Sequence, residues 1–140
     1  MNPDVINRKL ESLRRCVARI RSKMPLTQND LHTDYDLQDI VSVNLERAVQ
    51  MCVDIAAHVI SETEALAPDT MAESFSRLAD LELLTAQLAE RMRKAVGLRN
   101  ILVHHYTDID WKIIYEVVTH HLNDFVEFAQ VIDRLNSTDE

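Results

Sequence analysis

The fold is decided by residues 37–59, which read LQDIVSVNLERAVQMCVDIAAHV. Apolar side chains recur every three or four positions along it, at Leu37, Val41, Leu45, Ala48, Cys52, Ile55 and Val59. This spacing is that of one face of an α-helix, which we expect to run from about residue 33 to Ser61. Its other faces are also apolar, at Ile40, Val43, Val49 and Met51. The helix is therefore expected to be central, or shared between the core and a second chain.

Four further stretches predict helices. The first begins at Asn2 as N-cap, carries an apolar stripe from Ile6 to Met24 and ends before Pro25. The others are expected at about 70–81, at 85–106 and, in one continuous stripe, from Ile114 to Leu135. Residues 26–32 predict a loop and 136–140 a frayed polar tail. Short connections predict a single all-α domain over 1–140, a five-helix antiparallel bundle.

Composition supports an all-α fold. The 140 residues include one glycine and three prolines. Hairpin turns need glycine at positive φ, so an all-β fold is excluded in practice. Glycine-rich phosphate-binding loops are excluded as well, because each requires more than one glycine.

Charge is distributed in blocks along the chain. The formal net charge is −8, which as a bulk figure argues against a nucleic-acid partner. Residues 1–23, however, carry seven basic and two acidic side chains, and residues 91–107 carry four basic and no acidic ones. These blocks are either solvated faces paired with acidic neighbours or a phosphate-binding patch formed where the two helices lie together. In the second case Arg91, Arg93 and Lys94 are candidate RNA-phosphate ligands.

The cellular environment is indicated by two features. Cys16 and Cys52 occupy apolar helical positions and form no CxxC pair, so we expect reduced core residues in a cytoplasmic protein. No apolar run is long enough to span a membrane, and no signal peptide is indicated at the N-terminus.

The most unusual sequence is GLRNILVHHY, residues 97–106. The apolar stripe of this predicted helix passes through position 99, which is an arginine, and burying an unpaired guanidinium costs several kcal/mol. Gly97, the one glycine, sits in mid-helix, where it lets a ligand or another backbone come close or lets the helix bend. On a continuous helix Tyr106 lies within about 20° of Arg99, but His104 lies about 140° away. Either the helix unwinds near Val103, or the arginine of one chain meets the histidine of another across a two-fold axis.

An arginine and a histidine together suit one kind of chemistry. Imidazole transfers protons near neutral pH, and a fixed guanidinium binds a phosphate and stabilises charge developing on it. The pair suits attack by an RNA 2′-hydroxyl on its own phosphodiester, which needs no metal. The competing interpretation is a structural histidine and a salt-bridged arginine.

The spacing of Arg99, His104 and Tyr106 resembles the RX4HXY motif of the HepT toxins of the HEPN superfamily. Further similarity lies in residues 97–101, 37–45 and 117–122, and it extends over the length and helix order of the chain. The resemblance implies a homodimeric, metal-independent endoribonuclease without a cofactor, in which the two motifs face each other in a cleft.

The resemblance also implies residue roles. Arg99 would orient the scissile phosphate, His104 would act in general acid–base catalysis and Asn100 would support the histidine. His105, next to His104, leaves open whether it shares the catalytic role. The implied partner is a nucleotidyltransferase antitoxin of the MntA type, which would transfer AMP to Tyr106 and block the site by added bulk and charge.

Two other hypotheses remain at this point. The chain is alternatively a non-catalytic helical subunit that presents substrate to a nucleotidyltransferase. It is otherwise a helical scaffold without a site, which predicts an internal acid paired with Arg99 and no cleft at the end of that helix.

Overall fold

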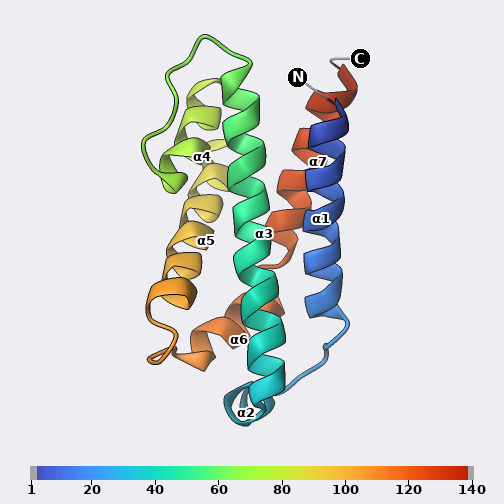
Figure 1. Ribbon diagram of the computed structural model, residues 1–140, viewed down its shortest axis with the longest axis vertical. Helices are drawn as coiled ribbons and strands as arrows, with labels where there is room; N and C mark the ends of the chain where they lie inside the picture. The colour runs from blue at the N-terminus through green and yellow to red at the C-terminus, as the bar shows by residue number, and fades with distance from the viewer. Residues whose placement is uncertain (1–2, 139–140) are drawn as a thin grey trace.

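The computed structural model describes residues 3–138, a part of the chain that forms seven helices and no strand (Figure 1). They are α1 (Pro3–Arg21), α2 (Gln28–Thr33), α3 (Tyr35–Ser61), α4 (Met71–Asp80), α5 (Ala86–His104), α6 (Trp111–His120) and α7 (Asn123–Thr138). The all-α expectation is confirmed, whereas the expected count of five helices is wrong. The expected N-cap Asn2 and the last two residues of the expected tail lie outside the described residues.

The starts of α3, α4 and α5 are set by capping side chains. Asp34, Thr70 and Thr85 each accept a hydrogen bond from the backbone N–H three residues ahead, at 3.1 Å. These contacts satisfy N–H groups that have no partner within the helix. The predicted starts of these three helices agree with the structure to within two residues for this reason.

Helix α2 occupies the stretch expected to be a loop. Thr27 and Asp30 form a capping box, in which each side chain accepts the other residue's backbone N–H at 3.0 Å. Leu31 is fully buried and anchors the short helix to the core. The expectation of a loop was therefore wrong. The six residues contain one apolar side chain, Leu31, so no periodic pattern indicated a helix there.

The expected last helix is two helices, α6 and α7. His121 ends α6, and its N–H donates to the Val117 carbonyl at 2.8 Å. Ile114 and Phe125, on either side of the break, are both buried, so the stripe continues although the helix does not. There is no glycine or proline at this turn, so no local pattern in the sequence indicated it. The expected tail also begins too early, because Asn136 is buried within α7.

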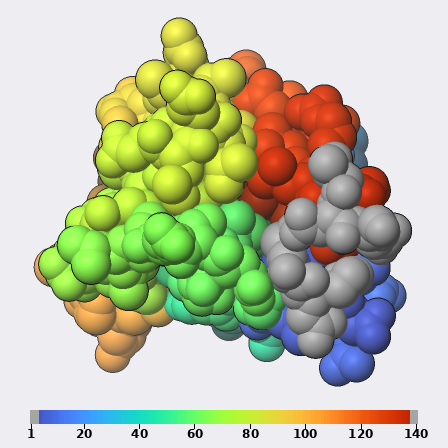
Figure 2. Space-filling view, turned by 90° about the horizontal axis from the view of Figure 1, so that it is seen from above, coloured from blue at the N-terminus to red at the C-terminus, as the bar shows by residue number. Residues whose placement is uncertain are grey.

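Helix α3 is central. It packs against α1, α4, α5 and α7, and α1, α3 and α5 run in alternating directions along the long axis (Figure 1). One end of the bundle is closed by α4 and residues 62–70 on one side and α7 on the other (Figure 2). The Phe75 and Phe128 rings join these two sides of the core edge to face, with centroids 5.7 Å apart.

Both cysteines lie in this core as free thiols, as expected. Burial raises the pKa of the Cys52 thiol well above its usual value. No helix in residues 3–138 combines the length and the apolar character needed to cross a bilayer.

Candidate active site at the end of α5

Helix α5 is continuous through His104. His105 is its C-cap, and the His105 N–H donates to the Ile101 carbonyl at 2.9 Å. Unwinding near Val103, one of the two expected arrangements, therefore does not occur. Tyr106 lies in the connection to α6, so its expected alignment with Arg99 on one helical face is also wrong.

Arg99 is half-buried against α3 and has no acidic partner among residues 3–138. Its Nη2 donates to Gln50 Oε1 at 3.5 Å and its Nη1 to Asn100 Oδ1 at 3.4 Å. Its Nε is buried without a hydrogen-bond partner among the described residues. Within residues 3–138, no carboxylate lies within 4.0 Å of the guanidinium. The pairing with an internal acid that the scaffold hypothesis requires is absent from this part of the chain.

Gln50 connects Arg99 to a chain of polar contacts that crosses α3. Its Nε2 donates to Asp54 Oδ1 at 2.9 Å, and Asp54 Oδ2 lies 3.7 Å from Lys9 Nζ on α1. The Gln50 amide contacts the guanidinium but does not neutralise its charge. Gln50 is 49 residues from Arg99, and nothing in the local sequence indicated this contact.

The other motif residues are solvent-exposed. His104, His105 and Asn100 are all exposed, and Tyr106 is 72% exposed. Asn100 accepts from Arg99, and no hydrogen bond joins it to His104 in the described structure. Within the described chain, then, Arg99 and Asn100 are brought together, and no hydrogen bond joins His104 to either of them.

Two of the three candidate phosphate ligands on α5 are already engaged with carboxylates. Arg91 donates to Asp124 and to Glu127, each at 2.7 Å. Burial lowers the Arg91 pKa, but these hydrogen bonds outweigh it and hold the pKa above its ordinary value.

Arg93 likewise pairs with Glu90 and donates to Ser76 Oγ at 3.0 Å. Lys94 is exposed and has no ion pair within 4.0 Å in residues 3–138. Of the three, only Lys94 has an uncompensated charge.

The two basic helices do not form a common patch. Helix α1 packs mainly against α3 and α7, whereas α5 packs mainly against α4, α3 and α7. Helix α3 stands between α1 and α5 in Figure 1. The expectation of a patch formed where these helices lie together is therefore wrong for a single chain.

A largely apolar cavity of about 600 Å³ lies on the other side of α5, against α6 and the start of α7. Gly97 and Ile101 line it together with Ile113, which is 49% exposed. His104 follows Gly97 by seven residues and so lies within about 20° of it on the helix surface. The row of α5 that carries His104 therefore borders this cavity, whereas Arg99 faces α3.

Substituting Gly97 by alanine is expected to stabilise the fold. A Cβ at this position meets nothing within 4 Å, and alanine is favoured over glycine in a helix by about 1 kcal/mol. The midpoint of thermal unfolding should rise by about 4 °C. A lower midpoint in calorimetry would show that the space beside Gly97 is not free in the folded protein.

No group of three or more His, Cys, Asp or Glu side chains in residues 3–138 is arranged to hold a metal ion. The ionisable side chains of the motif are the guanidinium of Arg99, the imidazoles of His104 and His105 and the phenol of Tyr106.

Comparisons with known proteins agree with the motif. The family model described as ribonuclease HepT-like matches residues 13–132. The mRNA nuclease HepT of Shewanella oneidensis is 38% identical over 129 residues, which cover 92% of this chain and 96% of the relative. The tRNA nuclease HepT of Aphanizomenon flos-aquae is 26% identical over 133 residues, covering 95% and 90% of the two chains.

A solved structure is similar over nearly the whole fold. It is the tri-AMPylated Shewanella oneidensis HEPN toxin in complex with the MNT antitoxin. The TM-score is 0.88 at 38% identity, with 96% of this chain and 99% of the other covered.

Proposed function

This chain belongs to the HepT-like ribonuclease family, and on that premise we propose that it is the toxin of a toxin–antitoxin pair. It cleaves RNA as a homodimer, without a metal ion, using Arg99, His104 and Asn100. A nucleotidyltransferase antitoxin of the MntA type inactivates it by adenylylating Tyr106.

The observation that carries the proposal is the environment of Arg99. A half-buried guanidinium held by amides, with no carboxylate within 4.0 Å in the described chain, keeps its full charge for a ligand. A structural arginine at such a position is normally paired, because an uncompensated buried charge is costly. The scissile phosphate is the anion that fits this site.

The homodimer is supported by the continuity of α5. His104 comes five positions after Arg99 in the helix, which places their side chains about 140° apart around the helix axis. One chain therefore cannot direct both at the same phosphate. A two-fold axis near the end of α5 brings the Arg99 of one chain to the His104 of its partner and forms two equivalent sites.

The proposed reaction is an internal transfer at phosphorus. His104 removes the proton from the 2′-hydroxyl, whose oxygen attacks the adjacent phosphorus while the bond to the 5′-oxygen breaks. Arg99 stabilises the charge that builds on the non-bridging oxygens, and the leaving oxygen takes a proton. Because the nucleophile belongs to the substrate, no metal-bound water is required.

The antitoxin and the substrate class are supported by the relatives. The similar solved structure is an AMPylated HEPN toxin with its MNT antitoxin, and the two curated relatives are an mRNA and a tRNA nuclease. In this chain Tyr106 is exposed beyond the end of α5, where a modifying enzyme can reach it. Two buried, unpaired cysteines fit a reducing compartment, and we place the protein in the cytoplasm.

Digestion of RNA in the presence of EDTA tests the proposal. Wild-type protein should cleave, and the Arg99→Ala/His104→Ala variant should not. The matched control is Arg21→Ala/His120→Ala, which removes an exposed arginine and an exposed histidine elsewhere and should cleave like wild type. Equal cleavage by the first variant and wild type would remove the catalytic assignment. Tight antitoxin binding with no cleavage by any of these proteins would instead favour the non-catalytic subunit.

A further inference from the structure

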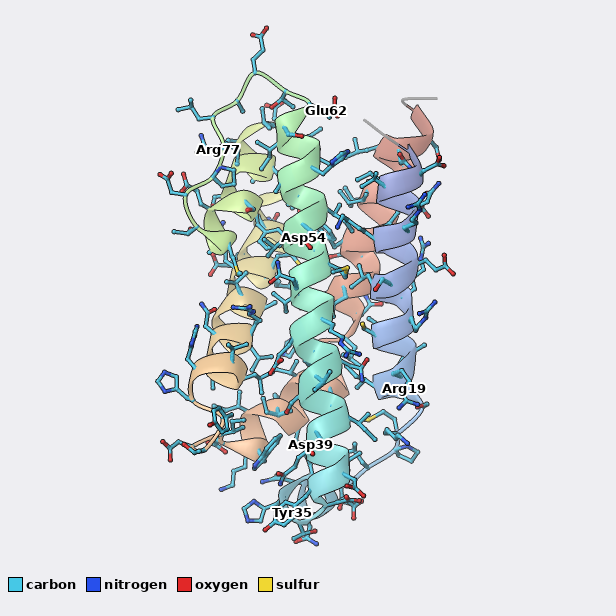
Figure 3. All side chains as sticks on the ribbon, in the orientation of Figure 1. Arg19, Tyr35, Asp39, Asp54, Glu62 and Arg77 are labelled. Carbon is cyan, nitrogen blue, oxygen red and sulfur yellow. The ribbon has the colours of Figure 1, made fainter. Side chains whose placement is uncertain are left out.

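A basic groove between α1 and α3 is separate from the proposed catalytic residues. It has a volume of about 570 Å³ and is lined by Arg15 and Arg19 of α1 and by Arg47 and Asp39 of α3. Figure 3 shows Arg19 and Asp39 on these two neighbouring helices. Three arginines face one aspartate, so the groove carries a positive charge in a chain whose net charge is −8.

The arginines of this groove are largely uncompensated. In residues 3–138 neither Arg19 nor Arg47 has an ion pair within 4.0 Å. Arg15 lies 4.0 Å from Glu11, and both of these side chains are 75% exposed, a pairing that water weakens. Four arginines elsewhere in the fold, Arg14, Arg77, Arg91 and Arg93, do have carboxylate partners.

The arginines of the groove also affect the pKa of a cysteine that lines it. Cys16 is buried there, and burial raises the pKa of its thiol, while Arg47 and Arg15 act in the opposite direction. Both guanidiniums line the groove together with this thiol. Asn44, also buried, donates to the Ile40 carbonyl at 2.8 Å and forms a fixed polar edge.

The groove leads to the proposed catalytic arginine. Arg47 precedes Gln50 by three residues, so the two side chains are neighbours on one face of α3. Gln50 in turn holds Arg99 at 3.5 Å. The neutral Gln50 therefore lies between the groove arginine Arg47 on α3 and Arg99 on α5.

We propose that the phosphates of the RNA strand flanking the scissile bond bind in this groove, on Arg15, Arg19 and Arg47. The proposal rests on the ribonuclease function proposed above. Guanidinium groups suit it, because they bind phosphate oxygens in pairs through a planar fork. Val43 and the half-buried Ile40 give the same groove an apolar wall against which a base packs. The three arginines position the substrate and take no part in bond breaking.

Binding of a short fluorescein-labelled single-stranded RNA, measured by anisotropy, tests this. All proteins carry His104→Ala so that the RNA stays intact. Adding Arg19→Gln/Arg47→Gln should weaken RNA binding about tenfold at low salt. It should also make the slope of log affinity against log salt shallower by about 1.4, because each phosphate contact to a single strand contributes about 0.7. Arg19→Lys/Arg47→Lys should keep most of the affinity. Arg21→Gln, on the opposite face of α1, should match the parent.

In the catalytically active background the same glutamine pair should raise KM about tenfold with kcat nearly unchanged. Unchanged RNA affinity and salt slope would overturn the proposal. An equal loss of RNA affinity in Arg21→Gln would also overturn it. Loss of the dimer or of antitoxin binding with RNA affinity intact would overturn it as well, and would make the groove a protein interface. Failure of the wild type to cleave RNA is a different result, and it would overturn the ribonuclease function itself.

Discussion

His104→Ala protein should cleave RNA about 10³-fold more slowly than wild type, the usual loss when a general acid–base group is removed. His104 is the last helical residue of α5 and is exposed, so its side chain makes few contacts that the fold needs. The thermal unfolding midpoint of the variant should therefore stay close to that of wild type. The measurement is a single-turnover rate on a labelled RNA, with circular dichroism to verify folding.

His105→Ala is the matched control for this substitution. His105 contributes its backbone N–H to the helix end, and alanine keeps that N–H. We expect its cleavage rate to remain within a few-fold of wild type. If His105→Ala loses the activity and His104→Ala keeps it, the catalytic role belongs to the second histidine of the doublet.

Adenylylation of Tyr106 should abolish RNA cleavage. Incubation with the antitoxin and ATP should add adenylyl groups to the wild-type chain, detected by intact mass, and activity should fall to background as they accumulate. The modification adds a negative charge and a bulky nucleoside beside the motif, where they repel and obstruct the RNA phosphate. The phenol is 72% exposed, so the transfer requires no unfolding.

Tyr106→Phe should remain unmodified and should keep cleaving RNA in the presence of antitoxin and ATP. Tyr35→Phe is the control, because Tyr35 is equally accessible at 77% exposure but lies at the start of α3. It should be modified like wild type. Adenylyl groups that persist on Tyr106→Phe would place the modification on another residue.

The sequence predicted those parts of the fold that have a local cause. The starts of α3, α4 and α5 follow from the capping residues Asp34, Thr70 and Thr85 together with periodic apolar stripes. Helix α2 lacks such a stripe, and the turn at His121 lacks glycine and proline, so both depend on packing in the folded chain. A capping box at Thr27 and Asp30 was the one local signal for α2.

The candidate site likewise combines a feature that the local sequence predicts with contacts between helices that it does not. Periodicity alone identified Arg99 as a charged residue on an apolar face. Its partner Gln50 comes from α3, and the carboxylates that neutralise Arg91 come from α7, so these contacts depend on which helices pack together. Helix α5 ends at His104, so Tyr106 does not share a helical face with Arg99. Extending the apolar stripe to position 106 did not predict this helix end.

The central claim is that Arg99 of one chain and His104 of its partner form one site. Separately purified Arg99→Ala and His104→Ala proteins should each be inactive; after mixing and exchange of subunits, half of the dimers combine the two chains. Each such dimer restores one of its two sites, so the mixture should recover about a quarter of the wild-type cleavage rate. Cleavage that stays at background after verified subunit exchange would contradict the shared site.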